Sequence, residues 1–337
     1  MAWLTELGVT SPVVAAPMAG GPTTPDLVLA AAGAGSLAFV AGGYLTAEAL
    51  ADQLAHVRAE EEVYGVNLFA PNPVPVDPAA YAAYRELIAP EAQRYGVELP
   101  AHPIEDDDAW RDKVDLLVDH PAPVVSFTFG IPEAAVLTAL RGAGSRLVQT
   151  VTSADEARRA SEAGVDALAV QASTAGGHSG TLTPERIPPE RALTDLIREI
   201  KAAVGLPLLG AGGIASRDHV AAVLAAGAEA AVVGTALLLA DESGASAAHR
   251  AGLTDHSRET AVMRAWTGRP ARGLRNSFSD AYDDPAPPGY PALHHLTRPL
   301  RRAAAAATDP ERVNLWAGTG FRSARAAPTA EILAGLA

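Results

Sequence analysis

One of the nine histidines lies in a setting that the others do not share. His178 belongs to the stretch QASTAGGHSG, residues 171–180, which follows an apolar run and places glycines close to the ring. A neutral imidazole in such a loop can take a proton from a substrate carbon, and an imidazolium can hold an anionic group, because histidine titrates near neutral pH. The simpler alternative is a histidine that anchors its own loop or contacts a bound phosphate.

Two glycine-rich stretches indicate an anion site. GAGGI spans residues 210–214 and VVGT spans residues 232–235, and each continues an apolar run. Glycine lets the backbone approach a ligand closely, and exposed N–H groups before a helix bind phosphate. Either stretch alone is explained by a tight turn. Two of them at successive strand ends favour a phosphate site, because barrels often bind phosphate there.

These residues need a scaffold, and an internal repeat predicts it. AGAGSLAFV at 32–40, AGVDALAVQ at 163–171 and AGAEAAVVG at 226–234 are alike, and AGSRLVQTV at 143–151 is a fourth, less regular copy. Each follows a helix-like stretch. The pattern predicts a helix, a glycine with positive φ, a tight turn and a buried strand. Strands that are apolar on both faces belong to parallel sheets.

Eight alternations of strand and helix predict an α/β fold, the (β/α)8 or TIM barrel. A doubly wound open sheet is the alternative, but no GxGxxG follows the first strand. The predicted strands are 13–17, 37–41, 63–69, 124–130, 146–151, 167–171, 207–212 and 230–235. Helices are predicted at 24–34, 46–61, 132–142, 153–163, 190–204 and 216–226. Ser216 is expected to cap the last of these helices.

The domain organisation follows from where the strand pattern ends. Residues 1–240 are expected to form the barrel, and residues 310–337 are expected to pack on it as a closing tail. Residues 241–309 show helical and loop patterns without further strands, so they are expected to form a smaller lid over the barrel mouth. An insertion at about 70–119 separates the third and fourth strands.

Two polar clusters outside the strand ends have simple interpretations. The acidic run EDDD at 105–108 is expected to be a solvated helix start, because four adjacent carboxylates cannot all face one metal ion. The neighbours His294 and His295 of the lid could contact a substrate, but a surface position is the expectation, because adjacent side chains point in different directions. No metal site is expected.

Composition excludes several classes of function. The formal net charge is −13 without any basic block, which argues against nucleic acids and anionic membranes as partners. The absence of cysteine excludes disulfides, iron–sulfur clusters and thiol nucleophiles. No apolar run reaches the ~18 residues of a membrane span, and residues 1–20 lack the Lys or Arg of a secretory signal. A cytoplasmic protein with a small-molecule ligand is the expectation.

Taken together, the motifs resemble the nitronate monooxygenase family, formerly called 2-nitropropane dioxygenases. The resemblance implies an FMN-containing barrel that oxidises alkyl nitronates, or nitroalkanes, with O2 to a carbonyl compound and nitrite. It spans almost the whole chain in order. The motifs are APMAGG at 16–21, GVNLF at 65–69, QASTAGGHSG at 171–180, GAGGI at 210–214, VVGT at 232–235, GRPARGLRN at 268–276 and NLWAGTG at 314–320.

The resemblance also implies roles for individual residues. Ala16, Pro17 and Met18 would lie against the flavin ring. Asn67 would bond its polar edge, and Gln171 would reach the ring edge or the ribityl chain. The ribityl phosphate would be held by Gly176, Gly213, Val232, Val233, Gly234 and Thr235, and Gly177, Ala211 and Gly212 would be further cofactor-binding residues. His178 would be the catalytic residue beside the ring, where it contacts the nitro compound.

Two departures from the family pattern concern the charge near the flavin. The family often has an acidic residue before AGGH, where this chain has Ser173 and Thr174, and often a lysine near the end of the fifth strand, where it has Gln149. Two other functions stay open. One is an NAD(P)H-dependent FMN reductase of quinones or enoyl thioesters on the same fold, and the other is a phosphate-ligand binder without enzymatic activity. The oligomeric state is left open.

Overall fold

A computed structural model describes residues 2–337, and its centre is a barrel of eight parallel strands. The strand order is β1-β9-β8-β6-β5-β4-β3-β2, and a bridge between Ala15 and Ala38 brings β1 and β2 together. The predicted (β/α)8 barrel is confirmed. The strands are β1 (Val13–Ala15), β2 (Phe39–Ala41), β3 (Gly65–Ala70), β4 (Val124–Phe129), β5 (Arg146–Val151), β6 (Ala167–Gln171), β8 (Leu208–Ala211) and β9 (Ala230–Val233).

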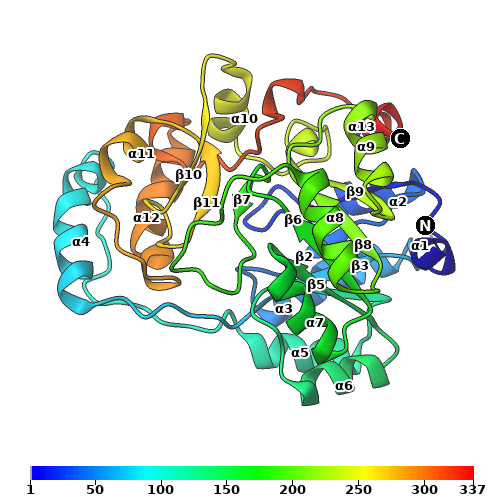
Figure 1. Cartoon of the computed structure of the whole chain (residues 1–337). Helices are drawn as coiled ribbons and strands as arrows, with labels where there is room; N and C mark the ends of the chain where they lie inside the picture. The colour runs from blue at the N-terminus through cyan, green and yellow to red at the C-terminus, as the bar shows by residue number, and fades with distance from the viewer. Residues whose placement is uncertain (1) are drawn as a thin grey trace.

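Helices surround this sheet (Figure 1). They are α2 (Pro25–Gly33), α3 (Ala47–Arg58), α5 (Trp110–Asp119), α6 (Ala134–Gly142), α7 (Ala154–Ala163), α8 (Leu193–Ala203) and α9 (Arg217–Ala225). The tail ends in α13 (Thr329–Leu336), which packs against α2 and α9. None of the helices within residues 2–337 has the length and hydropathy of a membrane span.

The turn chemistry expected from the repeat is present. In three of the four copies the aligned glycine lies in the positive-φ region that glycine adopts without strain: Gly144 at 106°, Gly164 at 90° and Gly227 at 109°. In the first copy the aligned Gly33 is the last residue of α2, and the positive φ, of 75°, belongs to Gly35. Ser216 caps α9, because its hydroxyl accepts from the N–H of His219. The helix ends therefore follow from local residue types.

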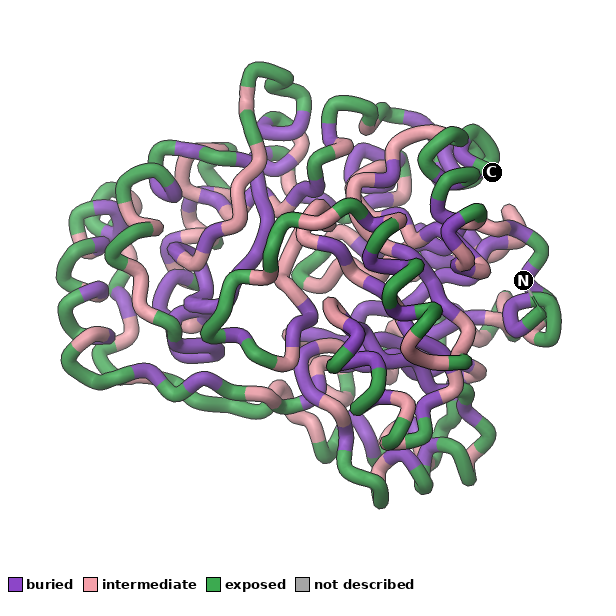
Figure 2. Tube along the Cα trace, in the orientation of Figure 1, coloured by how far each residue is buried: buried purple, intermediate pink, exposed green. Residues whose placement is uncertain are grey.

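Two layers of apolar side chains hold the barrel together. Alternate strand residues face the helices or the barrel interior, as Val13 and Val14 of β1 do in separate clusters. The interior cluster includes Trp3 and Leu4 of α1 (Ala2–Glu6), which closes the amino-terminal end of the barrel. Figure 2 shows buried residues along the strands and exposed residues on the outer helices.

The lid has its own core and draws on two stretches of the chain. Residues of the insertion, such as Tyr81 and Tyr84, pack with Trp266 and Phe278 of the later segment. In Figure 1 this unit lies to the left of the barrel. Its helices are α4 (Pro78–Gln93), α10 (Ala247–Thr254), α11 (Ser277–Tyr282) and α12 (Ala292–Ala306). The lid therefore includes α4 of the insertion as well as the segment 241–309, whereas α5 at the end of the insertion packs on the barrel.

The expectation that residues 241–309 contain no strand is wrong. β10 (Thr260–Met263) and β11 (Ala271–Leu274) form an antiparallel sheet, which β7 (Gly177–His178) joins from the barrel side. The sequences TAVM and ARGL are too short to show an alternating pattern. Their pairing with each other and with β7 makes them strands, and that pairing is not encoded locally.

The expectation for the acidic run is wrong at its last residue. α5 begins two residues after Asp108, and Asp108 turns inward because it adopts a left-handed conformation with φ of 59°. Its carboxylate accepts from the N–H of Tyr44 at 2.8 Å and lies 2.7 Å from the Nζ of buried Lys113. Burial raises the pKa of Asp108 to about 6, against the opposing effect of Lys113. The carboxylate thus ties the insertion to the barrel mouth.

Candidate active site

A cavity of about 780 Å³ lies at the carboxyl ends of the barrel strands, under α12 of the lid. Every residue that the sequence predicted for the site lines it. These are Ala16, Pro17, Met18, Asn67, Gln171, Gly176, Gly177, His178, Ala211, Gly212, Gly213, Val232, Val233, Gly234 and Thr235. The fold therefore brings together residues from five different strand ends.

The barrel side of the cavity presents unpaired backbone donors. Gly212 and Gly213 have φ of 130° and 70°, which turn the chain directly after β8. Within residues 2–337, the N–H groups of Gly212, Gly213, Gly234 and Thr235 make no hydrogen bond to the chain. Backbone N–H groups in folded proteins are nearly always paired. Four unpaired donors around one cavity fit an anionic group such as a phosphate.

Gly318 and Thr319, which follow the lid in the chain, lie over these unpaired N–H groups. The N–H of Gly318 donates to the Thr235 hydroxyl at 2.9 Å, and the N–H of Thr319 donates to the Thr174 carbonyl at 3.1 Å. A Cβ added at Gly176 would lie 2.5 Å from the Gly318 nitrogen. Glycine is required at position 176 because two backbones meet there.

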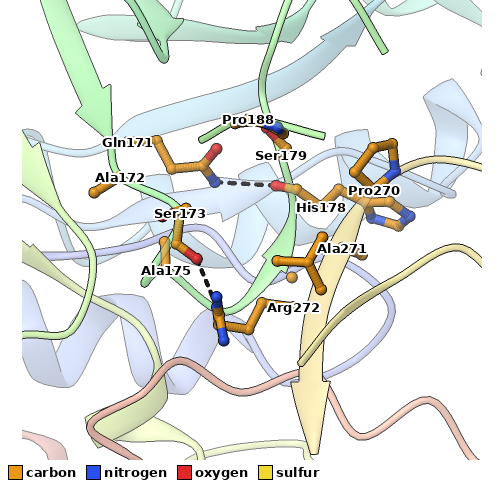
Figure 3. A pocket seen from close by; sticks show the side chains of 12 residues that line it. Gln171, Ala172, Ser173, Ala175, His178, Ser179, Pro188, Pro270, Ala271 and Arg272 are labelled. Carbon is orange, nitrogen blue, oxygen red and sulfur yellow. Dashed lines mark hydrogen bonds between the residues drawn. The ribbon is translucent and has the colours of Figure 1, made fainter. Parts of the chain in front are cut away.

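The amides of Asn67 and Gln171 are largely committed within the protein. Asn67 Nδ2 donates to the Ser126 and Thr128 hydroxyls at 2.9 and 3.1 Å, which leaves the side-chain oxygen Oδ1 for a ligand. Gln171 spans the histidine loop: Nε2 donates to the His178 carbonyl (Figure 3), and Oε1 accepts from the Gly180 N–H. Gln171 therefore shapes the loop that carries His178.

His178 lies in a strand and not in a loop, contrary to the sequence interpretation. It belongs to β7 and pairs with Ala271 of β11, and the N–H of Ser179 donates to the Pro270 carbonyl at 2.8 Å. The pairing joins residues about ninety positions apart, so the local glycine pattern does not reveal it. His178 lies where the barrel meets the lid.

The ring of His178 is enclosed by aromatic side chains. Its centroid lies 5.4 Å from that of Trp316, 5.7 Å from Tyr290 and 5.8 Å from Phe129. Burial, with the nearby charges of Arg269 and Arg301, lowers the pKa of His178 to about 3. The imidazole is therefore neutral near pH 7, and the alternative of an imidazolium in the free protein is not supported.

A buried guanidinium supports the wall behind this ring. Arg269 donates to the carbonyls of Ser179 and Thr181 at 3.2 and 2.6 Å, and it stacks 4.0 Å above the ring of Phe129. Phe129 itself has φ of 83°, an uncommon conformation for an aromatic residue. Strain of this kind occurs at ligand-binding sites that the surrounding structure fixes.

The lid side of the cavity is positively charged. Arg298, Arg301 and Arg302 of α12 line it, and no Asp or Glu is among the lining residues. Arg301 is oriented by hydrogen bonds to the Asn314 side chain and the His294 carbonyl. A cavity with arginine on one side and unpaired N–H groups on the other favours anionic ligands.

The expectation of a surface position is wrong for His294. Its side chain is 5% exposed, lines the cavity and stacks on Tyr44 with ring centroids 4.2 Å apart. Burial lowers the pKa of His294 well below its usual value. His295 points away and lies 2.8 Å from the Asp106 carboxylate.

The departures noted in the sequence have structural counterparts. Gln149 is buried and donates to the Phe127 and Thr150 carbonyls, and it does not line the cavity. Ser173 and Thr174 keep buried hydroxyl groups without a partner among the described residues. Positive charge comes from α12 instead of from β5.

Several cavity residues were missed by the sequence analysis. They are Tyr44, Phe69, Thr128, Phe129, Thr150, Arg298, Arg301, Arg302 and Trp316. The spacing of the three arginines, at i, i+3 and i+4, places them on one helix face and is a usable signal. Phe69 and Trp316 lie in the motifs GVNLF and NLWAGTG, and the remaining residues carry no local pattern.

Comparisons with known proteins agree with this architecture. The family model for nitronate monooxygenase matches residues 2–337. A probable nitronate monooxygenase of Staphylococcus saprophyticus is 33% identical over 323 residues, which cover 94% of this chain and 90% of that protein. A probable nitronate monooxygenase of Staphylococcus aureus is 32% identical over 336 residues, which cover 98% and 94%.

Two solved structures extend the comparison. FabK from Thermotoga maritima has a TM-score of 0.76 at 24% identity over 99% of this chain and 94% of that chain, which is a likeness of fold. Nitroalkane oxidase from Streptomyces ansochromogenes has a TM-score of 0.94 at 42% identity over 99% of this chain and 96% of that chain. The chain therefore belongs to the nitronate monooxygenase family and is an oxidoreductase of a generally flavin-dependent family.

Proposed function

We propose that this chain binds one FMN without covalent attachment and oxidises alkyl nitronates with O2 to a carbonyl compound and nitrite. The observation that carries the proposal is the charge of the cavity. Arginines line one side, unpaired backbone donors line the other, and no carboxylate is among the lining residues. Such a cavity suits both an anionic phosphate and an anionic substrate. The similar nitroalkane oxidase acts, by its name, on nitroalkanes.

The residues at the strand ends fit FMN. The unpaired N–H groups of Gly212, Gly213, Gly234 and Thr235 would hold its phosphate. Residues 16–18 and the side-chain oxygen of Asn67 would face the flavin ring, because these residues line the same cavity. When bound, FMN supplies the redox chemistry, since it takes electrons from the substrate and passes them to O2.

The lid residues favour a substrate that is already an anion. A neutral imidazole whose pKa is lowered to about 3 is a weak base, so His178 is poorly suited to deprotonating a neutral nitroalkane. A nitronate has already lost this proton. Arg298, Arg301 and Arg302 would attract and orient it, and the aromatic residues around His178 would exclude water.

Anaerobic mixing tests the proposal against the reductase alternative. The purified protein should carry yellow FMN, identified by mass after release, in a ratio of one per chain. A preformed nitronate should bleach the flavin, and air should then restore the colour and release nitrite. Rapid bleaching by NADH, without any by nitronates, would assign a reductase. A colourless protein that does not take up FMN would contradict both activities.

A further inference from the structure

The hydroxyl of Thr267 contacts a ring nitrogen of His178. Thr267 is 1% exposed, and its Oγ1 lies 2.9 Å from Nε2 of His178. A neutral imidazole has one N–H donor and one bare acceptor nitrogen. The partner of Nε2 therefore fixes what Nδ1 can do.

The surroundings of Thr267 favour one arrangement. Thr267 has a single hydroxyl hydrogen, and its two possible acceptors are Nε2 of His178 at 2.9 Å and the carbonyl of Arg269 at 3.4 Å. Hydrogen bonds from a hydroxyl to an oxygen are usually 2.5–3.0 Å long. The N–H of Arg269 points at the same hydroxyl oxygen from 3.5 Å. If Nε2 carried the ring hydrogen, the threonine hydrogen would have only the long contact to Arg269.

We infer that Thr267 donates to Nε2 and so holds His178 as the tautomer with hydrogen on Nδ1. No group within residues 2–337 bonds Nδ1, and His178 lines the cavity. The ring therefore presents an N–H donor to the ligand and not a bare nitrogen. Thr267 is a positioning residue, because it acts through His178.

The consequence for substrate choice rests on the proposed function. An N–H donor on Nδ1 can bond an oxygen of an anionic nitronate, whereas it cannot accept the α-proton of a neutral nitroalkane. Of the roles that the sequence left open for His178, the structure favours binding of the nitro group by a neutral imidazole. Thr267 thus orients the imidazole so that its N–H can bond the nitro group of a nitronate.

Nitrogen NMR reads the tautomer directly. The holoenzyme, labelled with 15N-histidine, would be recorded at pH 7.5 by long-range proton–nitrogen correlation. The His178 signals are assigned by their loss in His178→Asn. We expect a protonated Nδ1 and a bare Nε2. In Thr267→Val the hydrogen should redistribute toward Nε2, and in Thr267→Ser the wild-type pattern should remain, because the hydroxyl is retained.

Kinetics with the same variants test the positioning role. In Thr267→Val, kcat/KM for preformed nitronates should fall about 3- to 10-fold, chiefly through KM, because one oriented hydrogen bond is lost. Thr267→Ser should restore it. The control is Thr329→Val, which removes a hydroxyl bond to Glu242 of 2.7 Å from a fully buried threonine outside the cavity. It should change neither the tautomer nor KM.

The outcomes separate the role of Thr267 on the His178 ring from the proposed oxidation of nitronates. Hydrogen on Nε2 in the wild type would overturn the inference even if the protein oxidises nitronates. An unchanged tautomer in Thr267→Val would also overturn it, and any loss of activity would then come from packing. Hydrogen on Nδ1 in a protein that oxidises no nitronate would support the role of Thr267 on the ring and contradict the proposed function.

Discussion

The two sides of the cavity are built in different ways. The barrel side uses backbone N–H groups of two short turns, and in the first of them Gly212 and Gly213 have the positive φ that favours glycine. The lid side uses side chains: Thr267 precedes β11, and Arg298 and Arg301 lie on α12. The proposed cofactor site therefore depends on local turns, whereas the proposed substrate site depends on how the lid docks.

If this comparison holds, damage to one side should leave the other working. His178 marks the line between them, because its backbone pairs with β11 of the lid while its loop begins at β6 of the barrel. Variants on the barrel side and on the lid side test this separation.

The largest effect is expected from Gly213→Val on the barrel side. Gly213 has φ of 70°, and a Cβ there would lie 3.0 Å from the Thr319 hydroxyl. Because valine strains this turn and displaces N–H donors, FMN affinity should fall more than about 100-fold, as expected for losing two bonds to a charged group. Fluorescence titration of the apoprotein measures it. Gly205→Val, where a Cβ would meet nothing within 4 Å, is the control. Native FMN affinity in Gly213→Val would refute the proposed phosphate site.

His178→Leu should impair the substrate side alone. Leucine keeps much of the volume of the imidazole but has no N–H group, so KM for preformed nitronates should rise about 10- to 100-fold, the value of a hydrogen bond to a charged group. FMN content should stay at one per chain. Loss of FMN would show that His178 anchors the cofactor. A drop confined to neutral nitroalkanes would identify it as a base after all.

Acid should destabilise the junction of barrel and lid. His249, 7% exposed, bonds the Trp316 carbonyl, and burial lowers its pKa to about 4 from 6.5. Between pH 6.5 and 4, His249 is protonated in the unfolded chain but not in the folded chain. The free energy of unfolding therefore decreases as the pH falls from 6.5 toward 4. Lowering the pH from 7.5 to 5 should reduce the free energy of unfolding by about 2 kcal/mol through this one histidine.

Urea unfolding of His249→Gln at the two pH values checks this cost. The variant should lose about 2 kcal/mol less than the wild type on acidification, whatever its stability at pH 7.5. Equal losses in both proteins would show that His249 does not titrate on unfolding in this range.

The smallest effect is expected from Arg298→Gln and Arg302→Gln on the lid. Both side chains are exposed at the cavity, so water and salt screen them, and each loss should lower kcat/KM for nitronates about 3- to 10-fold. The effect should shrink at high salt, while FMN affinity stays native. Arg159→Gln, an exposed arginine of α7 away from the cavity, is the control. An unchanged kcat/KM at low salt would argue against a charged lid wall.

The sequence by itself determined the barrel and the barrel side of the cavity. Helix-ending glycines such as Gly164, the cap at Ser216 and the apolar strands act through neighbouring residues, so their patterns are readable locally. For the same reason the glycine turns after β8 and β9 could be placed at the cavity before the structure was known.

Only the tertiary structure decided the chemistry of the lid side. The strand character of residues 177–178 comes from pairing with β11, and the low pKa of His178 comes from burial beside Arg269 and Arg301. The inward turn of Asp108 and the burial of His294 likewise depend on distant contacts. Burial and pairing between separate segments set these properties, and neither is a function of the residues that adjoin a position in the chain.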